Sequence, residues 1–343
     1  MKPHVLVARL DNAGDVLLAG PAVRAVAAGA RRVTMLCGPQ GRAAAQLLPG
    51  VDEVLVYDAP WVAFEPKTLD RAETLALVGE VFCLKLDRAI ILSSFHQSPL
   101  PLALLLRLAG VPFVAATSVD YPGSLLDIRH RVSDAVHEVE RSLDLVRAAG
   151  YELPPGDDGS LAVRRGGGRP EPFGGEPYVV VHPGVSVPAR AWAPDRHAAL
   201  VDALVSAGRR VVVTGGPGER GLTARVAGPQ RREVLDLGGG TDLAGLAEII
   251  AGAEAIVVGN TGPAHLAAAV GTPVVSLFAP TVPAVRWRPW RAPHELLYRD
   301  VPCAGCRARV CPVEGHPCLG GVTVDEVLAA LNSLVPTRVG AAG

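Results

Sequence analysis

The sequence lacks an excess of charge of either sign. Its 33 lysine and arginine residues nearly balance 34 aspartate and glutamate residues, and the formal net charge at pH 7 is −1. Proteins that bind nucleic acids usually carry a clear excess of basic residues. The composition therefore gives no indication of a nucleic-acid partner.

The sequence also lacks the apolar segments that direct a chain to or across a membrane. Residues 1–4 lead directly into a short apolar run, without the charged region and cleavage site of a secretory leader. No stretch reaches the roughly 18 uninterrupted apolar residues of a membrane span, and the apolar segment 100–109 contains Arg107. We expect a cytoplasmic protein whose cysteines are reduced or bound to a metal.

Two common phosphate-binding motifs are missing. Neither half of the chain has G-x-G-x-x-G after its first predicted strand, and G-x-x-x-x-G-K-[ST] does not occur. Dehydrogenase and P-loop nucleotidase functions therefore lose their main support.

What the sequence does have is enough length and apolar content for two domains. The chain has 343 residues, of which 49% are hydrophobic and 20% charged, so that sizeable cores can form. In the first half we predict strands at 4–10, 32–37, 53–57, 88–93 and 112–116, and helices at 16–29, 40–48, 68–82 and 98–109. In the second half we predict strands in YVVVH, RRVVV, VLDL, AIVVG and PVVSLF, and helices at 194–207, 219–227, 242–252 and 263–270.

The regular alternation of strands and helices predicts an α/β fold with two facing, doubly wound, Rossmann-like domains. Apolar strands without polar alternation indicate parallel sheets covered on both faces. A segment dense in glycine, proline and charge separates the two blocks, as in a linker. We place the first domain at 1–160, the linker at 161–177 and the second domain at 178–336.

Small or glycine-rich turns follow the predicted strands of the second half. Ligands of open α/β sheets bind outside the carboxyl ends of the strands, and glycine lets a ligand approach the backbone closely. The turn 259–265 also opens a helix, whose free N–H groups and dipole favour an anion such as phosphate. Thr261 is either a helix cap or a phosphate ligand. His265 lies in the first turn of the same helix, where a protonated histidine would oppose the dipole, so we interpret it as a neutral phosphate ligand.

Several stretches together resemble glycosyltransferase family 9, the heptosyltransferase-like enzymes. They are LDNAGDVLLAGPAV near the N-terminus, HEVERSLDLV at 137–146, HPGVSVPARAWAPDRHAALVDAL at 182–204, VTGGPGE at 213–219, GNTGPAHLAAAVGTPVVSLFAPTVP from 259 onward, and the cysteine-rich segment. The resemblance implies a GT-B fold, with the donor nucleotide sugar bound mainly by the C-terminal domain and the acceptor facing the N-terminal domain. It also implies inverting transfer without a catalytic metal or other required cofactor.

The resemblance assigns roles to particular residues. The family's catalytic carboxylate falls on Asp15, its phosphate-binding cation on Arg190, and its ribose-binding acid on Glu219. Arg190 stands where many members have lysine, and Asn260 stands where an acidic residue is common. The donor-binding residues predicted in this way and from the turns are His182, Gly184, Ser186, Arg190, Gly215, Gly216, Glu219, Asn260, Thr261, Gly262, Pro263 and His265.

Asp15 has a clear chemical use in such an enzyme. Inverting transfer needs a base to take the proton of the acceptor hydroxyl as it attacks the anomeric carbon, and a carboxylate also stabilises an oxocarbenium-like sugar. Arg190, His265 and the helix N–H groups would stabilise the leaving diphosphate. The alternative for Asp15 is a helix N-cap, and Asp11 or Asn12 could serve the turn equally well.

The remaining candidates concern the acceptor and the cysteines. His96, Gln97 and Arg129 are possible acceptor contacts, with a solvated loop as the alternative. Cys303, Cys306, Cys311 and Cys318 have a spacing that suits a structural zinc site, with reduced thiols or a disulfide pair as alternatives. Cys37 and Cys83 lie in apolar runs and are predicted to be in the core.

The predicted function is transfer of a sugar, by default heptose from ADP-heptose, to a saccharide or glycolipid acceptor, with peripheral membrane contact as an accompanying expectation. Lipopolysaccharide core is the acceptor best known for the family. The alternatives are a GT-B nucleotide-sugar 2-epimerase and a non-catalytic nucleotide-sugar-binding protein.

Overall fold

The computed structural model describes residues 1–62, 67–168 and 171–335. The chain divides into two compact units, Met1–Arg164 (unit 1) and Arg165–Gly343 (unit 2). The first residues of the segment expected as a linker belong to unit 1. Leu161 is buried there, and Arg164 donates from Nη2 to the carbonyl oxygen of Leu48 over 2.7 Å.

Unit 1 contains a six-stranded sheet with the strand order β3-β2-β1-β4-β5-β6. All neighbouring strands are parallel, and the order is that of the Rossmann fold. The strands are β1 (His4–Arg9), β2 (Arg32–Cys37), β3 (Glu53–Val56), β4 (Arg88–Ile91), β5 (Val114–Thr117) and β6 (Ile128–His130). The edge strand β6 is not predicted from the sequence.

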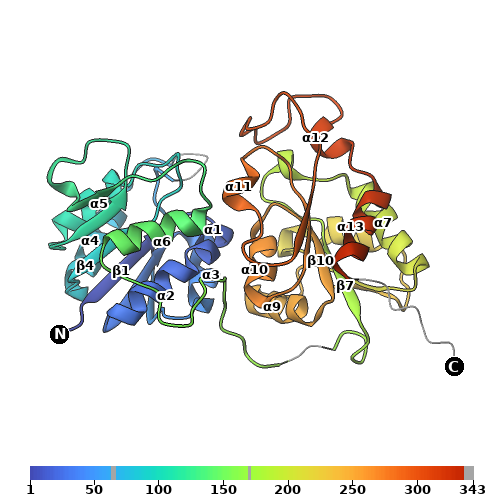
Figure 1. The fold of residues 1–343 in the computed structure, drawn as a ribbon, viewed down its shortest axis with the longest axis horizontal. Coiled ribbons are helices and arrows are strands. Elements are labelled where there is room, and N and C mark those ends of the chain that lie inside the picture. Colours follow the sequence, from blue (N-terminus) through green and yellow to red (C-terminus); the bar gives the residue numbers. More distant parts are fainter. Residues whose placement is uncertain (63–66, 169–170, 336–343) are drawn as a thin grey trace. The chain divides into compact units, whose positions relative to one another are not determined.

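Helices cover both faces of this sheet (Figure 1). They are α1 (Ala13–Leu18), α2 (Gly20–Gly29), α3 (Arg42–Leu47), α4 (Arg71–Leu84), α5 (Leu100–Leu108) and α6 (Glu138–Ala148). Helices α1 and α2 replace the single helix predicted at 16–29. The chain turns at Ala19, and Pro21, at the start of α2, has no N–H for a helical hydrogen bond.

Unit 2 repeats the same topology. Its parallel six-stranded sheet has the order β12-β11-β10-β7-β8-β9, the same Rossmann order read from the opposite edge. The strands are β7 (Tyr178–His182), β8 (Arg210–Val213), β9 (Val234–Asp236), β10 (Ala255–Gly259), β11 (Val274–Leu277) and β12 (His294–Leu297). Strand β7 is buried along its whole length, which explains its run of apolar residues.

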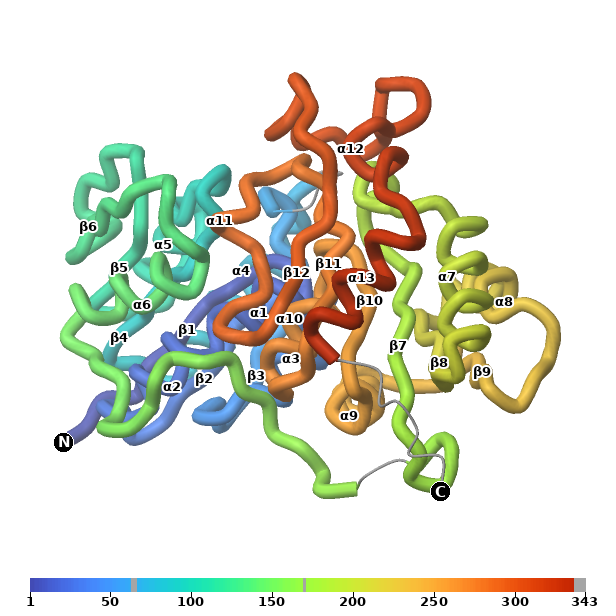
Figure 2. Tube along the Cα trace, turned by 45° about the vertical axis from the view of Figure 1, so that its right-hand side comes forward, coloured from blue at the N-terminus to red at the C-terminus, as the bar shows by residue number. Residues whose placement is uncertain are grey.

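The helices of unit 2 also lie on both faces of their sheet (Figure 1). They are α7 (Pro194–Ser206), α8 (Arg220–Ala227), α9 (Leu243–Gly252), α10 (Gly262–Val270), α11 (Ala284–Trp287), α12 (Pro317–Gly320) and α13 (Val324–Leu334). The last helix, α13, lies along β10 and β12 (Figure 2). Its buried Val327 and Leu331 belong to the same core as α7. No helix in the described part of the chain is long and apolar enough to cross a membrane.

The strand order determines where each unit can bind a ligand. In a sheet of this order the connections leave in opposite directions from two central strands, which opens a crevice at their carboxyl ends. These strands are β1 and β4 in unit 1, and β7 and β10 in unit 2. The residues that follow them are the candidates for function.

Candidate active site

A buried arginine lies at the crevice of unit 1. Arg9, the last residue of β1, is 1% exposed. Its guanidinium contacts three carboxylates: Nε lies 2.7 Å from Asp11, Nη2 lies 3.0 Å from Asp15, and Nη1 lies 3.3 Å from Glu138. The cluster therefore joins the end of β1, the first turn of α1 and the first residue of α6.

Asp15 is the most accessible carboxylate of the cluster. Its side chain is 21% exposed, against 8% for Asp11 and 1% for Glu138. Helix α1 begins at Ala13 with Asn12 as its N-cap. Asp15 is therefore inside the first turn, where it binds Arg9, and is not the helix cap that the sequence left as the alternative.

The three carboxyl groups of the cluster share Arg9, and Arg141 and His96 act on Glu138 and Asp11 from nearby. Burial raises the pKa of the Asp11 and Glu138 carboxyl groups, and Arg9 opposes that rise in both. Burial would lower the pKa of Arg9, but the surrounding carboxylates raise it above its ordinary value. Arg9 is therefore a permanent cation that holds these acidic groups together.

The loop after β4 contributes polar groups to the same cluster. Arg9 Nη2 donates to Ser94 Oγ over 2.7 Å, and Gln97 Nε2 donates to Asp11 Oδ1. Gln97 thus lies at the crevice, and its neighbour His96 is exposed. Their role as acceptor contacts stays a prediction. Arg129 is placed elsewhere, on edge strand β6.

Arg129 has partners of its own at that edge. It donates from Nε to the carbonyl oxygen of Ser118 over 3.2 Å, and from Nη2 to the carbonyl oxygen of Val119. Strand β6 is separated from β1 by β4 and β5. These contacts indicate a structural role in the turn after β5, and we leave Arg129 out of the candidate site.

In unit 2, a buried histidine connects the ends of two neighbouring strands. His182 ends β7, and its Nδ1 lies 2.9 Å from Oγ1 of Thr214 after β8. Burial lowers the pKa of His182 to about 4, against a smaller upward effect of Glu219. The ring is therefore neutral at physiological pH and is suited to hydrogen bonding.

Glu219 occupies space that two glycines leave open. Its Oε2 accepts a hydrogen bond from the backbone N–H of Gly216 over 2.7 Å. A Cβ on Gly184 would lie 2.2 Å from Glu219 Oε1, and a Cβ on Gly215 would lie 2.6 Å from Thr223 Cγ2. The glycines predicted from the sequence are therefore needed for this close packing around a carboxylate.

Arg190 lies beside the N-terminus of α10. It closes the short turn Pro188–Arg190, and it donates from Nε to Thr281 Oγ1 over 3.3 Å and from Nη1 to the carbonyl oxygen of Asn260 over 3.4 Å. Thr261 is the N-cap by position, but its side chain makes no capping hydrogen bond. The cation Arg190 and the positive end of the α10 dipole thus meet at the carboxyl end of β10, which is an arrangement that attracts anions.

The other predicted donor-binding residues lie in the same loops. Gly262 and Pro263 form the first turn of α10, and His265 is buried in that helix. Ser186 is exposed in the loop after β7. Among the residues that the structure describes, it therefore brings the predicted donor set to the carboxyl ends of β7, β8 and β10.

Sequence reasoning missed three residues of these sites. Arg9 and Glu138 hold the cluster of unit 1, and Thr281 holds Arg190 in unit 2. The sequence did contain a signal for Arg9. This charged residue directly follows the apolar run HVLVA and stands two positions before an aspartate. Cys37 is buried as predicted, but the prediction that Cys83 is in the core is wrong, because Cys83 is on the exposed side of α4.

Comparisons with known proteins agree with this architecture. The profile of glycosyltransferase family 9 (heptosyltransferase) matches residues 87–316. Lipopolysaccharide heptosyltransferase 3 of Escherichia coli is 31% identical over 172 residues, and the match covers 48% of each chain. The chain thus matches only about half of this relative's length.

Solved structures match nearly the whole chain. The glycosyl transferase family 9 protein of Veillonella parvula has a TM-score of 0.78 at 17% identity, over 97% of both chains. The heptosyltransferase WaaC of E. coli with ADP-2-deoxy-2-fluoro heptose has a TM-score of 0.71 at 20% identity, over 96% of this chain and 99% of that one. The two Rossmann-like units therefore form a fold of the GT-B class, and the protein belongs to glycosyltransferase family 9.

Proposed function

We propose that the protein is an inverting glycosyltransferase that moves a sugar from a nucleoside diphosphate sugar to an acceptor hydroxyl. In this proposal unit 2 binds the donor, and unit 1 supplies the base and contacts the acceptor. The single observation that carries the donor assignment is Arg190 beside the N-terminus of α10, at the crevice of the unit 2 sheet.

A diphosphate fits this half of the site on chemical grounds. A guanidinium binds phosphate oxygens through two parallel N–H groups, and a helix start offers further N–H donors. Negative charge grows on the diphosphate as the sugar leaves, so these groups stabilise the transition state more than the ground state. They supply the stabilisation for which other glycosyltransferases use a metal ion, and we propose a reaction without one.

Two further donor contacts follow from the packing of the turns. We propose that Glu219 accepts hydrogen bonds from the donor ribose, since its carboxylate is held beside Gly184 at the end of β7. His182 and the Gly215–Gly216 turn form the adjoining surface.

Asp15 is the proposed base. Its carboxylate is the most accessible in the cluster and is oriented by Arg9. Removal of the acceptor proton as the hydroxyl attacks the anomeric carbon gives a product of inverted configuration. Gln97 and His96, on the loop after β4, are the proposed contacts for the acceptor sugar.

The names of similar proteins suggest the substrates. One relative is a lipopolysaccharide heptosyltransferase, and the solved WaaC structure contains an ADP-heptose analogue. We therefore propose ADP-heptose as the donor and a saccharide of the lipopolysaccharide-core type as the acceptor.

A nucleotide screen tests the donor assignment. The protein is heated with ADP, GDP, UDP or dTDP, because a ligand that binds only the folded state raises the melting temperature by mass action. We expect stabilisation by ADP, its loss in Arg190→Ala, and its retention in Arg225→Ala, which removes an exposed arginine of α8. Failure of every nucleotide to stabilise the wild type would contradict the donor site.

An activity assay separates glycosyl transfer from the two alternatives. The protein is incubated with ADP-heptose, with and without a panel of saccharide acceptors, and the products are identified by mass spectrometry and NMR. Transfer with inverted configuration is expected only with acceptor. Epimerised nucleotide sugar without acceptor would indicate an epimerase, and ADP-heptose binding without turnover on any acceptor would indicate a binding protein.

A further inference from the structure

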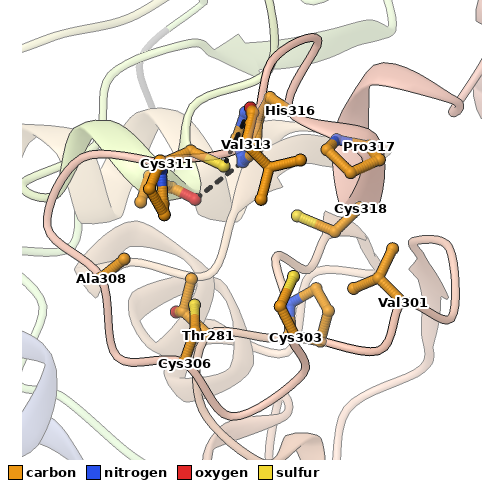
Figure 3. Close-up of a pocket in the computed structure, with 13 residues that line it drawn as sticks. Thr281, Val301, Cys303, Cys306, Ala308, Cys311, Val313, His316, Pro317 and Cys318 are labelled. Atoms are coloured by element: carbon orange, nitrogen blue, oxygen red, sulfur yellow. Dashed lines mark hydrogen bonds between the residues drawn. The ribbon is translucent and has the colours of Figure 1, made fainter.

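Four cysteines surround one pocket in unit 2. Between β12 and α12 the chain has no helix or strand over residues 298–316, and Cys303, Cys306 and Cys311 lie in this segment. Cys318 is the second residue of α12. All four border a cavity of about 30 Å³, together with Thr281 and His316. Figure 3 shows their side chains entering this pocket from different sides.

The four thiols are available as ligands. Each of these cysteines is free, and their spacing is Cys-x2-Cys-x4-Cys-x6-Cys. All four line the same pocket, although Cys318 belongs to helix α12 and the other three to the irregular segment before it.

The segment that carries them is irregular and is tied to the rest of unit 2 at a few points, such as the backbone hydrogen bond from Gly305 to Pro280 over 2.7 Å. Residues 302–307 are all exposed, and two non-glycine residues, Arg307 and His316, have left-handed backbone angles with φ of 54° and 47°. A long irregular loop inside a compact domain is uncommon without a functional or covalent constraint. A bound metal ion is one such constraint, because it closes the loop.

We propose that Cys303, Cys306, Cys311 and Cys318 bind one Zn²⁺ ion as four thiolates. Four thiolates in a tetrahedron, with zinc–sulfur distances of about 2.3 Å, are a common structural zinc site. Each thiol loses its proton to solvent when the ion binds, and no atom is oxidised or reduced. His316 is outside the ligand set, because its Nε2 donates to the carbonyl oxygen of Ala189 over 3.0 Å.

Zinc binding would require the thiols to move closer together. Among the described residues, no three histidine, cysteine, aspartate or glutamate side chains already stand in the geometry of a metal site. Cys303 and Cys306 are exposed, on a turn that contains Gly305 with φ of 78°.

The metal-bound loop would support the proposed donor site. Arg309 accepts a backbone hydrogen bond from Ala189 over 2.8 Å, and Arg307 donates one to Thr281 over 3.0 Å. Ala189 precedes Arg190, and Thr281 accepts from the Arg190 side chain. The ion would thus position Arg190 from two sides, a consequence that rests on the proposed function, whereas the metal site itself does not.

Metal analysis of the full-length protein tests the site directly. The protein is produced in zinc-supplemented medium, purified under reducing conditions, and assayed by inductively coupled plasma mass spectrometry. We expect one zinc per chain in the wild type, in Cys83→Ser and in His316→Asn, and its loss in Cys303→Ser and in Cys318→Ser. Absence of zinc from the reduced wild type, an equal content in all variants, or iron in its place would overturn the proposal.

Thiol counting gives an independent readout that does not need activity or nucleotide binding. With a water-soluble disulfide reagent, the zinc-bound protein should expose one fast thiol, Cys83, and a strong chelator should release four more. Cys37 should react only after unfolding, since it is buried. Fast reaction of the exposed Cys303 and Cys306 together with Cys83 before chelation would contradict metal binding, as would a pair that reacts only after reduction, which would indicate a disulfide.

The two proposals can fail separately. Zinc with no stabilisation by any nucleotide would leave the metal site standing and remove the donor site. Nucleotide binding without zinc would do the opposite. If both hold, chelation should weaken ADP binding in the wild type but should not change it further in Cys303→Ser.

Discussion

Arg9 donates from Nη2 to Oδ1 of Asp15 over 3.0 Å, which links the last residue of β1 to the first turn of α1. The same nitrogen donates to Ser94 Oγ over 2.7 Å. Arg9 is therefore held from both central strands of the unit 1 sheet. This contact orients the Asp15 carboxylate, whose side chain is 21% exposed.

Replacing the proposed base should remove transfer and leave donor binding intact. Asp15→Asn keeps an oxygen for Arg9 but has no carboxylate to accept a proton. We expect kcat to fall by about 10²- to 10⁴-fold, the usual contribution of general-base catalysis, while stabilisation by ADP stays as in the wild type. Glu53→Gln, which removes an exposed carboxylate of the same unit, is the control. Near-normal turnover by Asp15→Asn would show that the base lies elsewhere.

Removing the buried cation should destabilise unit 1. In Arg9→Met, three carboxylates lose their common counter-ion in a buried setting, and breaking such a set typically costs about 3–5 kcal/mol. Arg32→Met removes an exposed partner of Glu53 and should change stability by about 0–1 kcal/mol. Urea denaturation of both variants measures the difference. Equal stability of the two would mean that Arg9 contributes no more than a surface ion pair.

A single added methyl group should disturb the proposed ribose contact. In Gly184→Ala the new Cβ would meet the Glu219 carboxylate at 2.2 Å, so that Glu219 must move. We expect weaker ADP binding by calorimetry, with only a small loss of stability, because the carboxylate is the free end of a flexible side chain that can move aside.

Two further variants test this cause. Gly218→Ala should be neutral, because nothing lies within 4 Å of its new Cβ. In a Glu219→Ala background, the Gly184→Ala change should have no further effect, because the clash is gone. If Gly184→Ala still lowered stability in the Glu219→Ala background, the cause would be the backbone at residue 184 and not a clash with Glu219.

Acid should destabilise unit 2 through two buried histidines. Burial lowers the pKa of His182 to about 4 and that of His197 to about 3, from an ordinary value of 6.5. The folded state therefore binds fewer protons than the unfolded state below pH 6.5, so stability is full above this pH and is lost as the pH falls toward the folded-state values.

The histidine effect can be isolated by substitution. Each histidine should lower the free energy of unfolding by up to about 1.4 kcal/mol per pH unit in this window. His197→Phe keeps a ring against Trp192, which His197 contacts edge to face, and removes the titrating group. The free energy of unfolding is measured by denaturation between pH 7 and pH 4.5. As the pH falls, it should decrease less in the variant than in the wild type. Parallel curves for the two proteins would contradict the assignment.

The central strands were predictable because burial dictates their composition. A strand covered on both faces, such as β7 with the sequence YVVVH, has to be apolar along its length. Edge strand β6, with the sequence IRH, is only half buried, and its charged residues instead suggested a binding loop. The division of 16–29 into α1 and α2 depends on the position of one proline.

The candidate site was predictable only in part, because much of it depends on contacts between distant segments. The turns that carry Asp15, Glu219 and Thr261 follow strands and could be located from the sequence. Glu138, in contrast, meets Arg9 across 129 residues, and no local pattern connects the two. Burial alone distinguishes Arg9 from the many arginines that end a strand at the surface.

The two sheets share one strand order, but the crevices at their central strands carry different groups. Unit 1 places three carboxyl groups around the buried guanidinium of Arg9, whereas unit 2 presents Arg190 and a helix start. Under the proposed function, Arg190 attracts the diphosphate of the donor to unit 2. In unit 1, Asp15, the most accessible carboxylate of its cluster, is left for a hydroxyl group, which carries no charge of its own.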